Sequence, residues 1–255
     1  LMKQGPLAFF GQTWQPSNGH YGALTMVAGT LATSMLALFL AIPLSLGVGI
    51  FSGWLARGRW AFLMRSFLQV MAGIPSVVFG LWGLSSLVPV LGKWHPPGSG
   101  WLAASLVLCG MMVPTMALSL DSSLRSVPFE QRRYAMALGL SPWGALRLTG
   151  WPALKSGLGL ASMLGLVRAL GETMAVLLVA GNVANMPSGL FEPVRTLTAG
   201  IALEMAYAGH EHRSALYVLG WSVMSINLPR FRSNERNAIR VRRRARLHAG
   251  ARRGP

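Results

Sequence analysis

Long apolar runs without charged residues alternate with short polar segments along the first 228 residues. A helix needs about 20 mostly apolar residues to cross the hydrocarbon core of a membrane. Four runs reach that length, and a fifth of 15 residues ends before Pro229. We therefore predict an all-α, polytopic membrane domain over residues 1–228. Its transmembrane helices, about five, are expected at residues 23–51, 66–92, 101–120, 158–180 and 214–228.

The composition excludes a soluble globular domain. Charged residues make up 12% of the chain, against roughly 25% in soluble domains, and the mean hydropathy is +0.45. The net charge of +16 is concentrated at one end, since residues 229–255 hold ten of the 23 basic residues. We predict that this Arg-rich tail is disordered and attracted to anionic membrane lipid. Nucleic-acid binding and a changed reading frame are the alternatives, and we expect no nucleic-acid partner.

The basic residues between the spans predict the orientation, because cytoplasmic loops are enriched in Lys and Arg. The polar segments after the first, third and fifth spans hold 18 Lys and Arg residues, against four in the other loops. This places residues 121–156 and the C-terminal tail in the cytoplasm and the N-terminus outside. The chain starts at Leu1 without a signal-peptide pattern, and we expect that a first helix is missing.

The polar segment 121–156 carries the signals of two short helices. Residues 126–128 favour a helix start, and Gly139 is suited to the left-handed conformation that ends many helices. Ser141-Pro142 favours a second start. We expect that helix to end just before Pro152, because the residue preceding a proline avoids the α conformation. The two helices would form a compact cytoplasmic knob, and an amphipathic hairpin resting on lipid headgroups is the alternative.

Two charged residues fall inside the fourth span. Arg168 and Glu172 are four positions apart, which predicts that they share one helix face. A buried charge is costly in a membrane and is generally paired or lines a solute path. Arg suits a tetrahedral oxyanion, because its planar fork offers several donors. Glu172 could position Arg168 or accept a proton from a protonated oxyanion, and a simple ion pair between the two is the alternative.

The second span contains residues that disfavour a regular helix. Gly73, Pro75 and Gly80 are expected to break it. A proline inside a span frees a carbonyl group, and the adjacent Ser76 can hydrogen-bond to backbone groups. A packing kink and a substrate-lining role for this segment both fit the pattern.

Enzymatic and metal chemistry have little support in the sequence. The single cysteine, Cys109, excludes an internal disulfide and a cysteine-based metal cluster. The spans contain no nucleophile–base pair or metal-ligand cluster, and the chain lacks a phosphate-binding Gly-x-x-x-x-Gly-Lys-Ser/Thr loop. We expect no enzyme activity, no metal site and no bound cofactor, and we interpret His210 and His212 as solvated loop residues.

Several segments resemble those of known transport proteins. Residues 135–139, with Pro152 thirteen positions after Gly139, are similar to the "EAA" loop of bacterial ABC-importer permeases, with Arg133 at the position of the family's Glu. Residues 168–176, Arg-Ala-Leu-Gly-Glu-Thr-Met-Ala-Val, closely resemble a signature of the PstC family of phosphate-importer permeases. Residues 73–84 resemble the second signature of that family, and residues 29–31 and 41–44 its first membrane segment.

The resemblance implies a type I ABC importer in the bacterial inner membrane. This chain would pair with a PstA-like second permease, with PstB-like ATPase subunits that bind ATP and Mg²⁺, and with a PstS-like periplasmic phosphate-binding protein. It would pass inorganic phosphate by alternating access, powered by the partner ATPase. Permeation of sulfate or molybdate, a passive anion channel and a structural membrane subunit are the alternatives. The cytoplasmic knob favours the transporter, since a channel needs no ATPase socket.

The resemblance and the residue patterns together assign three groups of positions. The substrate path would contain Arg168, Glu172, Thr173 and Ser76. Coupling to the ATPase would use Arg133, Ala135, Gly139 and Pro152. The helix breaks would lie at Gly73, Pro75 and Gly80.

Overall fold

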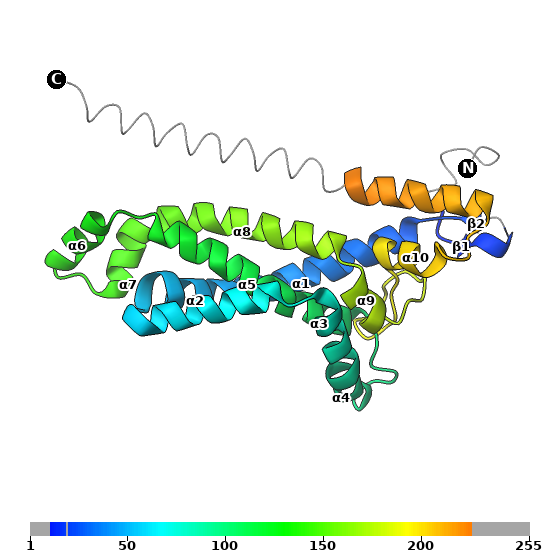
Figure 1. Cartoon of the computed structure of the whole chain (residues 1–255), viewed down its shortest axis with the longest axis horizontal. Helices are drawn as coiled ribbons and strands as arrows, with labels where there is room; N and C mark the ends of the chain where they lie inside the picture. The colour runs from blue at the N-terminus through cyan, green and yellow to red at the C-terminus, as the bar shows by residue number, and fades with distance from the viewer. Residues whose placement is uncertain (1–10, 19, 226–255) are drawn as a thin grey trace, which may run out of the picture.

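The computed structural model describes residues 11–18 and 20–225 (Figure 1). A small antiparallel hairpin, β1 (Trp14–Gln15) and β2 (His20–Tyr21), precedes a helical chain. The helices are α1 (Leu24–Ile50), α2 (Gly58–Gly73), α3 (Ser76–Trp82), α4 (Val88–Gly92), α5 (Trp101–Arg125), α6 (Phe129–Ala137), α7 (Pro142–Ala145), α8 (Trp151–Gly171), α9 (Met174–Val179) and α10 (Leu197–Glu204). Turns of π-helix at Phe51–Leu55 (η3), Gly83–Leu87 (η4) and Leu146–Gly150 (η5) extend α1, α3 and α7. Residues 210–225 are also helical. The predicted all-α class is confirmed.

Three helices in the described part of the chain are long and apolar enough to cross a membrane, at Leu24–Leu55, Trp101–Arg125 and Pro142–Gly171. A fourth span is present if α2 and the helix from Ser76 to Gly92 count as one, although they meet at 89°. These helices correspond to the first four predicted spans. The fifth is helical from residue 210 to residue 225. Its predicted end and the Arg-rich tail at 229–255 lie outside the described residues.

The long helices lie side by side in an elongated bundle (Figure 1). The face of α1 toward α5 carries small residues, which let the two backbones approach closely. A Cβ atom at Gly49 would lie 2.7 Å from the Cβ of Leu120, and one at Gly53 would lie 3.0 Å from the Cα of Asp121. Large apolar side chains of α1 point outward instead, and Phe39 is 74% exposed. This inverted pattern, small inside and large outside, is typical of a membrane bundle.

The second span turns sharply at Gly73 and Pro75, between α2 and α3. Ile74 and Pro75 have extended backbones, with ψ of 131° and 139°. The predicted break at Gly80 is wrong, because Gly80 lies inside α3. A Cβ at Gly80 would lie 2.8 Å from the Cα of Ala175. The glycine therefore serves close packing of α3 against α9 rather than a bend.

The fourth span is broken where a continuous helix was predicted. Glu172 is extended, with φ −73° and ψ 131°, and separates α8 from α9. Its Oε1 accepts hydrogen bonds from the backbone N–H groups of Thr173 (3.2 Å) and Ala175 (3.5 Å). A polar side chain that satisfies nearby N–H groups competes with the regular helix in this way. The prediction that Arg168 and Glu172 share one helix face is therefore wrong.

The helix that follows Ser141 does not stop before Pro152. Trp151 is helical, with φ −56° and ψ −44°, and the helix continues from Pro142 to Gly171. The π-turn η5 ends at Gly150, two residues before this proline. A proline ring clashes with the carbonyl four residues earlier in a regular α-helix, and a local π-turn shifts that hydrogen-bond register. The predicted two-helix segment thus contains one short helix, α6, followed by an extension of the fourth span.

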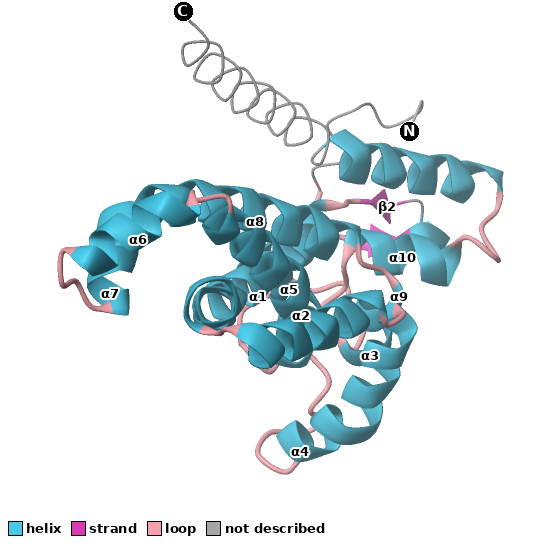
Figure 2. Ribbon diagram, turned by 60° about the vertical axis from the view of Figure 1, so that its left-hand side comes forward, coloured by secondary structure: helices cyan, strands magenta, loops and turns pink. Residues whose placement is uncertain are grey.

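The two ends of the bundle have different structures. The turn formed by α6 and α7 lies at one end, and the β-hairpin and α10 lie at the other (Figure 1). Figure 2 shows α4 projecting to one side of the long helices, after the bend at Pro75. The polar segment between the third and fourth spans is shorter than the predicted range 121–156, because α5 continues to Arg125.

Candidate functional site

Arg168 lies in the last turn of α8, one turn before the break in the fourth span. Its Nη1 is 3.5 Å from Thr115 Oγ1, a long hydrogen bond to α5. Its Nε is buried and has no hydrogen-bond partner among the described residues. A buried donor without a partner carries a desolvation cost. Arg168 therefore retains donors for an acceptor that the described chain does not supply.

Glu172 does not neutralise Arg168, because no ion pair joins the two in the described structure. Its Oε1 accepts from the N–H groups of Thr173 and Ala175, and its backbone carbonyl accepts from Thr198 Oγ1 at 2.7 Å. Its Oε2 makes no hydrogen bond with the described residues. The carboxylate thus holds the start of α9 and keeps one oxygen available.

Ser76, the first residue of α3, lies at the other helix break. Gly80 packs against Ala175, and Gly83 packs against Val179. Because both contacts advance together along the chain, α3 and α9 run in the same direction. Ser76 lies one turn before Gly80, and Glu172 lies about one turn before Ala175. The two helix breaks therefore lie at a similar height along the bundle. The side chain of Ser76 is half-buried.

Two threonines at this level were missed by the sequence analysis. Thr115 follows Pro114 inside α5 and contacts Arg168. Thr198 is at the start of α10, where its hydroxyl lies 3.3 Å from that of Thr196. A polar residue beside a proline within an apolar span was the available signal for Thr115. Nothing in the sequence near Thr198 indicated its contact with Glu172.

The turn between α6 and α7 has a well-defined geometry around Gly139. This residue has φ +79°, a conformation that only glycine adopts readily. The N–H of Leu140 donates to the carbonyl of Ala135 at 3.3 Å, and the N–H of Gly139 donates to that of Met136 at 3.0 Å. These two bonds form the Schellman motif that ends many helices. The prediction of a helix stop at Gly139 is confirmed.

Around this turn, buried and exposed positions are sharply divided. Ala135 is buried on the inner face of α6, whereas Arg133 is exposed, with its guanidinium 5.7 Å from the ring centre of Phe129. Several large apolar side chains are exposed here, including Leu138 (77%) and Tyr134 (67%). Pro152 is exposed at the start of α8. Exposed apolar surface of this kind marks a site of contact with another molecule.

The opposite end of the bundle is held by a polar cluster around Glu204. Its carboxylate accepts hydrogen bonds from Trp14 Nε1 (2.8 Å) and Arg195 Nη1 (2.7 Å), and lies 2.7 Å from His212 Nε2. Its side chain is 9% exposed. The interpretation of His212 as a solvated loop residue is therefore wrong, whereas His210 is exposed as expected. The described residues contain no group of three or more side chains that could hold a metal ion.

A family model for the inner membrane component of binding-protein-dependent transport systems matches residues 45–243. The chain belongs to this family. It is a transport permease subunit rather than an enzyme, and it is a multi-pass protein of the bacterial inner membrane. The resemblance inferred from the "EAA"-like loop and the two signatures is confirmed.

Individual relatives support a narrower group within the family. The phosphate transport system permease protein PstC of Xylella fastidiosa (strain Temecula1) is 34% identical over 243 residues, which cover 87% of this chain and 75% of that protein. PstC of Pasteurella multocida is 36% identical over 228 residues, with 81% and 71% covered. PstC 1 of Mycobacterium tuberculosis is 37% identical over 212 residues, with 74% and 63% covered.

Solved structures of ABC transporters share the fold. An inward-facing structure of the MetNI methionine transporter matches with a TM-score of 0.68, covering 90% of this chain and 99% of that chain at 16% identity. A structure of an amino acid ABC transporter with histidines matches with a TM-score of 0.61, covering 85% and 92% at 14% identity. At this identity the comparison establishes the architecture of an ABC permease subunit.

Proposed function

We propose that this permease passes inorganic phosphate into the cytoplasm as one subunit of an ATP-driven importer. The observation that carries the proposal is Arg168, a cation inside a spanning helix whose buried Nε has no partner in the described structure. The identities of 34–37% to permeases named for phosphate transport support the choice of anion. We propose a PstA-like permease, PstB-like ATPase subunits and a PstS-like binding protein as its partners.

The substrate path is proposed at the level of the two helix breaks. Arg168 would donate to the oxyanion from α8, and Thr115 would add a hydroxyl from α5, since it already lies 3.5 Å from Arg168 Nη1. Thr173 and Ser76 begin the segments that follow the breaks. Irregular backbone is tolerated at membrane depth where it lines a cavity, which supports a path here.

Glu172 is the proposed source of discrimination between phosphate and sulfate. Its Oε2 is not engaged by the described chain, whereas Oε1 is held by two backbone N–H groups. A carboxylate oxygen accepts a hydrogen bond from HPO₄²⁻, which carries a proton, and repels fully ionised sulfate. This role replaces the predicted positioning of Arg168 by Glu172.

Energy would enter through the knob formed by α6 and α7. We propose that its exposed apolar residues, together with Arg133, dock onto the ATPase, and that ATP and Mg²⁺ bind there and not on this chain. Gly139 and the buried Ala135 fix the shape of the docking turn. Because Pro142–Gly171 is one helix, a displacement of the knob would reach Arg168 through a rigid element. Docking of the knob onto the ATPase would place the knob and the tail at 229–255 in the cytoplasm. There the tail would meet anionic lipid.

Uptake of ³²P-labelled phosphate tests this proposal, in a strain that lacks its own phosphate permease and carries this chain with its partner subunits. We expect uptake that Arg168→Ala abolishes and that excess sulfate leaves unchanged. Glu172→Gln should admit sulfate as a competitor. Arg59→Ala is the matched control, because Arg59 is an exposed arginine at the start of α2. Membrane insertion of each variant is measured by immunoblotting of the membrane fraction.

Two results would contradict the proposal. Uptake that survives Arg168→Ala would remove the arginine from the substrate path. Phosphate uptake that sulfate suppresses in the wild-type protein would assign the permease to oxyanions in general rather than to phosphate.

A further inference from the structure

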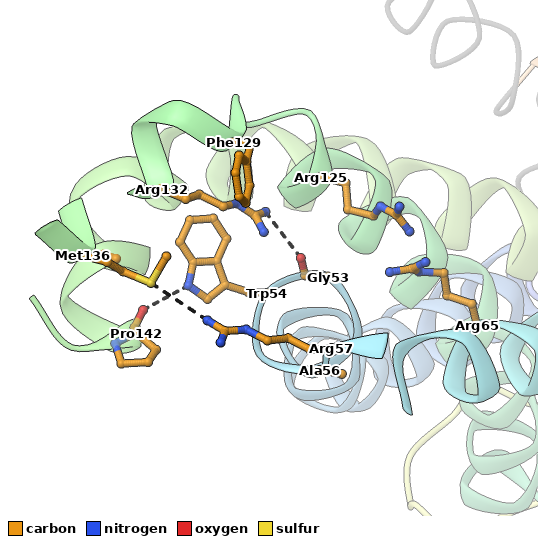
Figure 3. A pocket seen from close by; sticks show the side chains of 11 residues that line it. Gly53, Trp54, Ala56, Arg57, Arg65, Arg125, Phe129, Arg132, Met136 and Pro142 are labelled. Atoms are coloured by element: carbon orange, nitrogen blue, oxygen red, sulfur yellow. Dashed lines mark hydrogen bonds between the residues drawn. The ribbon is translucent and has the colours of Figure 1, made fainter. Parts of the chain in front are cut away.

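A second basic site lies at the knob end of the bundle, apart from Arg168. A cavity of about 320 Å³ opens between η3, α2 and the residues that join them, the end of α5 and the knob. Figure 3 shows the side chains around it. Its lining includes four arginines, Arg57, Arg65, Arg125 and Arg132, together with Trp54 and Phe129. The volume falls at the lower end of the range of ligand pockets, roughly 300–1,000 Å³.

The arginines differ in how far they are neutralised. Arg65 pairs with Asp121, with its Nε 3.1 Å from both carboxylate oxygens. Arg125 has no ion pair or hydrogen bond from its side chain to the described residues. Within the described residues, the Arg57 side chain makes one hydrogen bond, a long one of 3.9 Å to the sulfur of Met136. Asp121 therefore pairs with one of the four guanidinium groups, and two others, those of Arg57 and Arg125, keep most of their donors.

Arg132 is held rigidly at the wall of the cavity. Its guanidinium stacks over the ring of Trp54, at 3.9 Å from the ring centre, and Nη2 donates to the carbonyls of Leu124 and Gly53. Trp54 in turn donates from Nε1 to the carbonyl of Pro142 at 3.0 Å. The Nε of Arg132 is buried and unpartnered in the described structure. Burial lowers the pKa of this guanidinium, and repulsion by Arg125 acts in the same direction, against the smaller effect of Asp121.

The surroundings place the cavity at a membrane surface. It lies beside the ends of two spanning helices, Leu24–Leu55 and Trp101–Arg125. Large aromatic side chains are exposed at this end of the bundle, including Phe129 (69%), which lines the cavity, and Trp60 (73%), three residues after the lining residue Arg57. Aromatic residues gather at the boundary between lipid and water. Basic pockets between helices on the cytoplasmic side bind phospholipid headgroups.

We propose that this cavity binds a phosphate group, contributed by the headgroup of an anionic phospholipid or by inorganic phosphate from the cytoplasm. Arg125, Arg57 and the Nε of Arg132 donate to its oxygens, and arginine forks match the geometry of phosphate. The bound anion relieves the repulsion between Arg125 and Arg132 and braces the knob against α2 and α5. The site rests on the proposed orientation of the chain but not on its transport substrate.

Binding to the purified full-length chain tests the proposal without transport. Native mass spectrometry would compare phosphatidylglycerol with zwitterionic phosphatidylcholine at equal concentrations. We expect retained phosphatidylglycerol, and about fivefold weaker binding in Arg125→Gln and in Arg57→Gln, the change expected for one arginine near an anionic surface. Arg59→Gln is the matched control, since Arg59 is exposed two positions from Arg57 and does not line the cavity. Its binding should equal that of the wild type.

A second arm separates the two sources of the phosphate group. ³²P-labelled phosphate is added to lipid-free chain carrying Arg168→Gln, which removes the proposed transport site. Retention that depends on Arg125 identifies free phosphate, and phosphatidylglycerol that millimolar phosphate fails to displace identifies the lipid. Equal losses in Arg59→Gln and Arg125→Gln would overturn the proposal, because they would indicate diffuse surface charge. Loss of the bound anion when the ATPase subunits are added would also overturn it and assign the cavity to the ATPase interface.

Discussion

Trp14 and Glu204 are 190 positions apart in the sequence and are joined by a hydrogen bond of 2.8 Å from the indole Nε1 to a carboxylate oxygen. The bond connects β1 to the end of α10. Arg195 and His212 reach the same carboxylate, so that four separate segments meet at one buried acid. The Glu204 cluster therefore ties the first described residues to the last described helix.

Removing this carboxylate should destabilise the end of the bundle that carries the β-hairpin and α10. We expect Glu204→Leu to lower the free energy of unfolding by about 3–5 kcal/mol, because Arg195 would keep a partly buried charge without its partner. The effect is measured by thermal unfolding of the detergent-solubilised chain, with the folded fraction at each temperature quantified by size-exclusion chromatography. Glu211→Leu is the matched control, since Glu211 is exposed. An equal loss in both variants would contradict a structural role for the cluster.

Close packing of α3 against α9 yields a second prediction. A methyl group at Gly80 would lie 2.8 Å from the Cα of Ala175 and 2.9 Å from Leu178 Cδ1. Gly80→Ala should therefore cost about 1–3 kcal/mol of stability, as overpacking does. Gly110→Ala, where no atom of the described residues lies within 4 Å of the added Cβ, should be neutral or stabilising by up to about 1 kcal/mol, because alanine favours the helix. Unfolding midpoints of the two variants provide the test, and a Gly80→Ala protein as stable as the wild type would refute the close approach.

The sequence predicted the spans well because their signal is local. Charge-free runs of about 20 residues are read directly from composition, and Gly139 is a local turn signal. The break at Glu172 was missed, because a helix-period pattern continues through it and the hydrogen bonds that stop α8 come from one carboxylate. Pro152 was wrongly taken as a helix stop, since a π-turn can absorb a proline. The partners of Arg168 and Glu204 depend on tertiary contacts, which no local pattern records.

The turn at Gly139 should control coupling between the knob and the ATPase. A Cβ there would meet no atom of the described residues within 4 Å, so Gly139→Ala is expected to act through the backbone, at φ +79°. The left-handed conformation costs a residue with a Cβ about 1–2 kcal/mol. We expect reduced phosphate uptake per ATP hydrolysed by the reconstituted transporter, with normal membrane insertion.

The control for that turn is Gly159→Ala in α8. A Cβ at Gly159 also meets no neighbour within 4 Å in the part of the chain that the structure describes, and Gly159 lies inside the helix α8. This variant should keep wild-type uptake and gain slightly in helix stability. Equal uptake per ATP in both variants would show that the geometry of the Gly139 turn is not needed for coupling.

The loop before α10 should respond to acid. Glu192 Oε2 accepts hydrogen bonds from the hydroxyl and the N–H of Ser188, and the hydroxyl is the largest cause of a pKa below the ordinary value of 4.5. A carboxyl group with a lowered pKa in the folded state stabilises that state above the unfolded pKa, and this contribution is lost as the pH falls through the folded value.

Ser188→Ala should bring the pKa of Glu192 toward 4.5. The wild type should therefore be more stable than Ser188→Ala at neutral pH, with the difference shrinking below about pH 4.5. Ser214→Ala, which removes a hydroxyl bonded only to a backbone carbonyl, should shift stability equally at every pH. Unfolding midpoints measured across this pH range decide the matter, and a constant difference for Ser188→Ala would show that the hydrogen bond is not linked to ionisation.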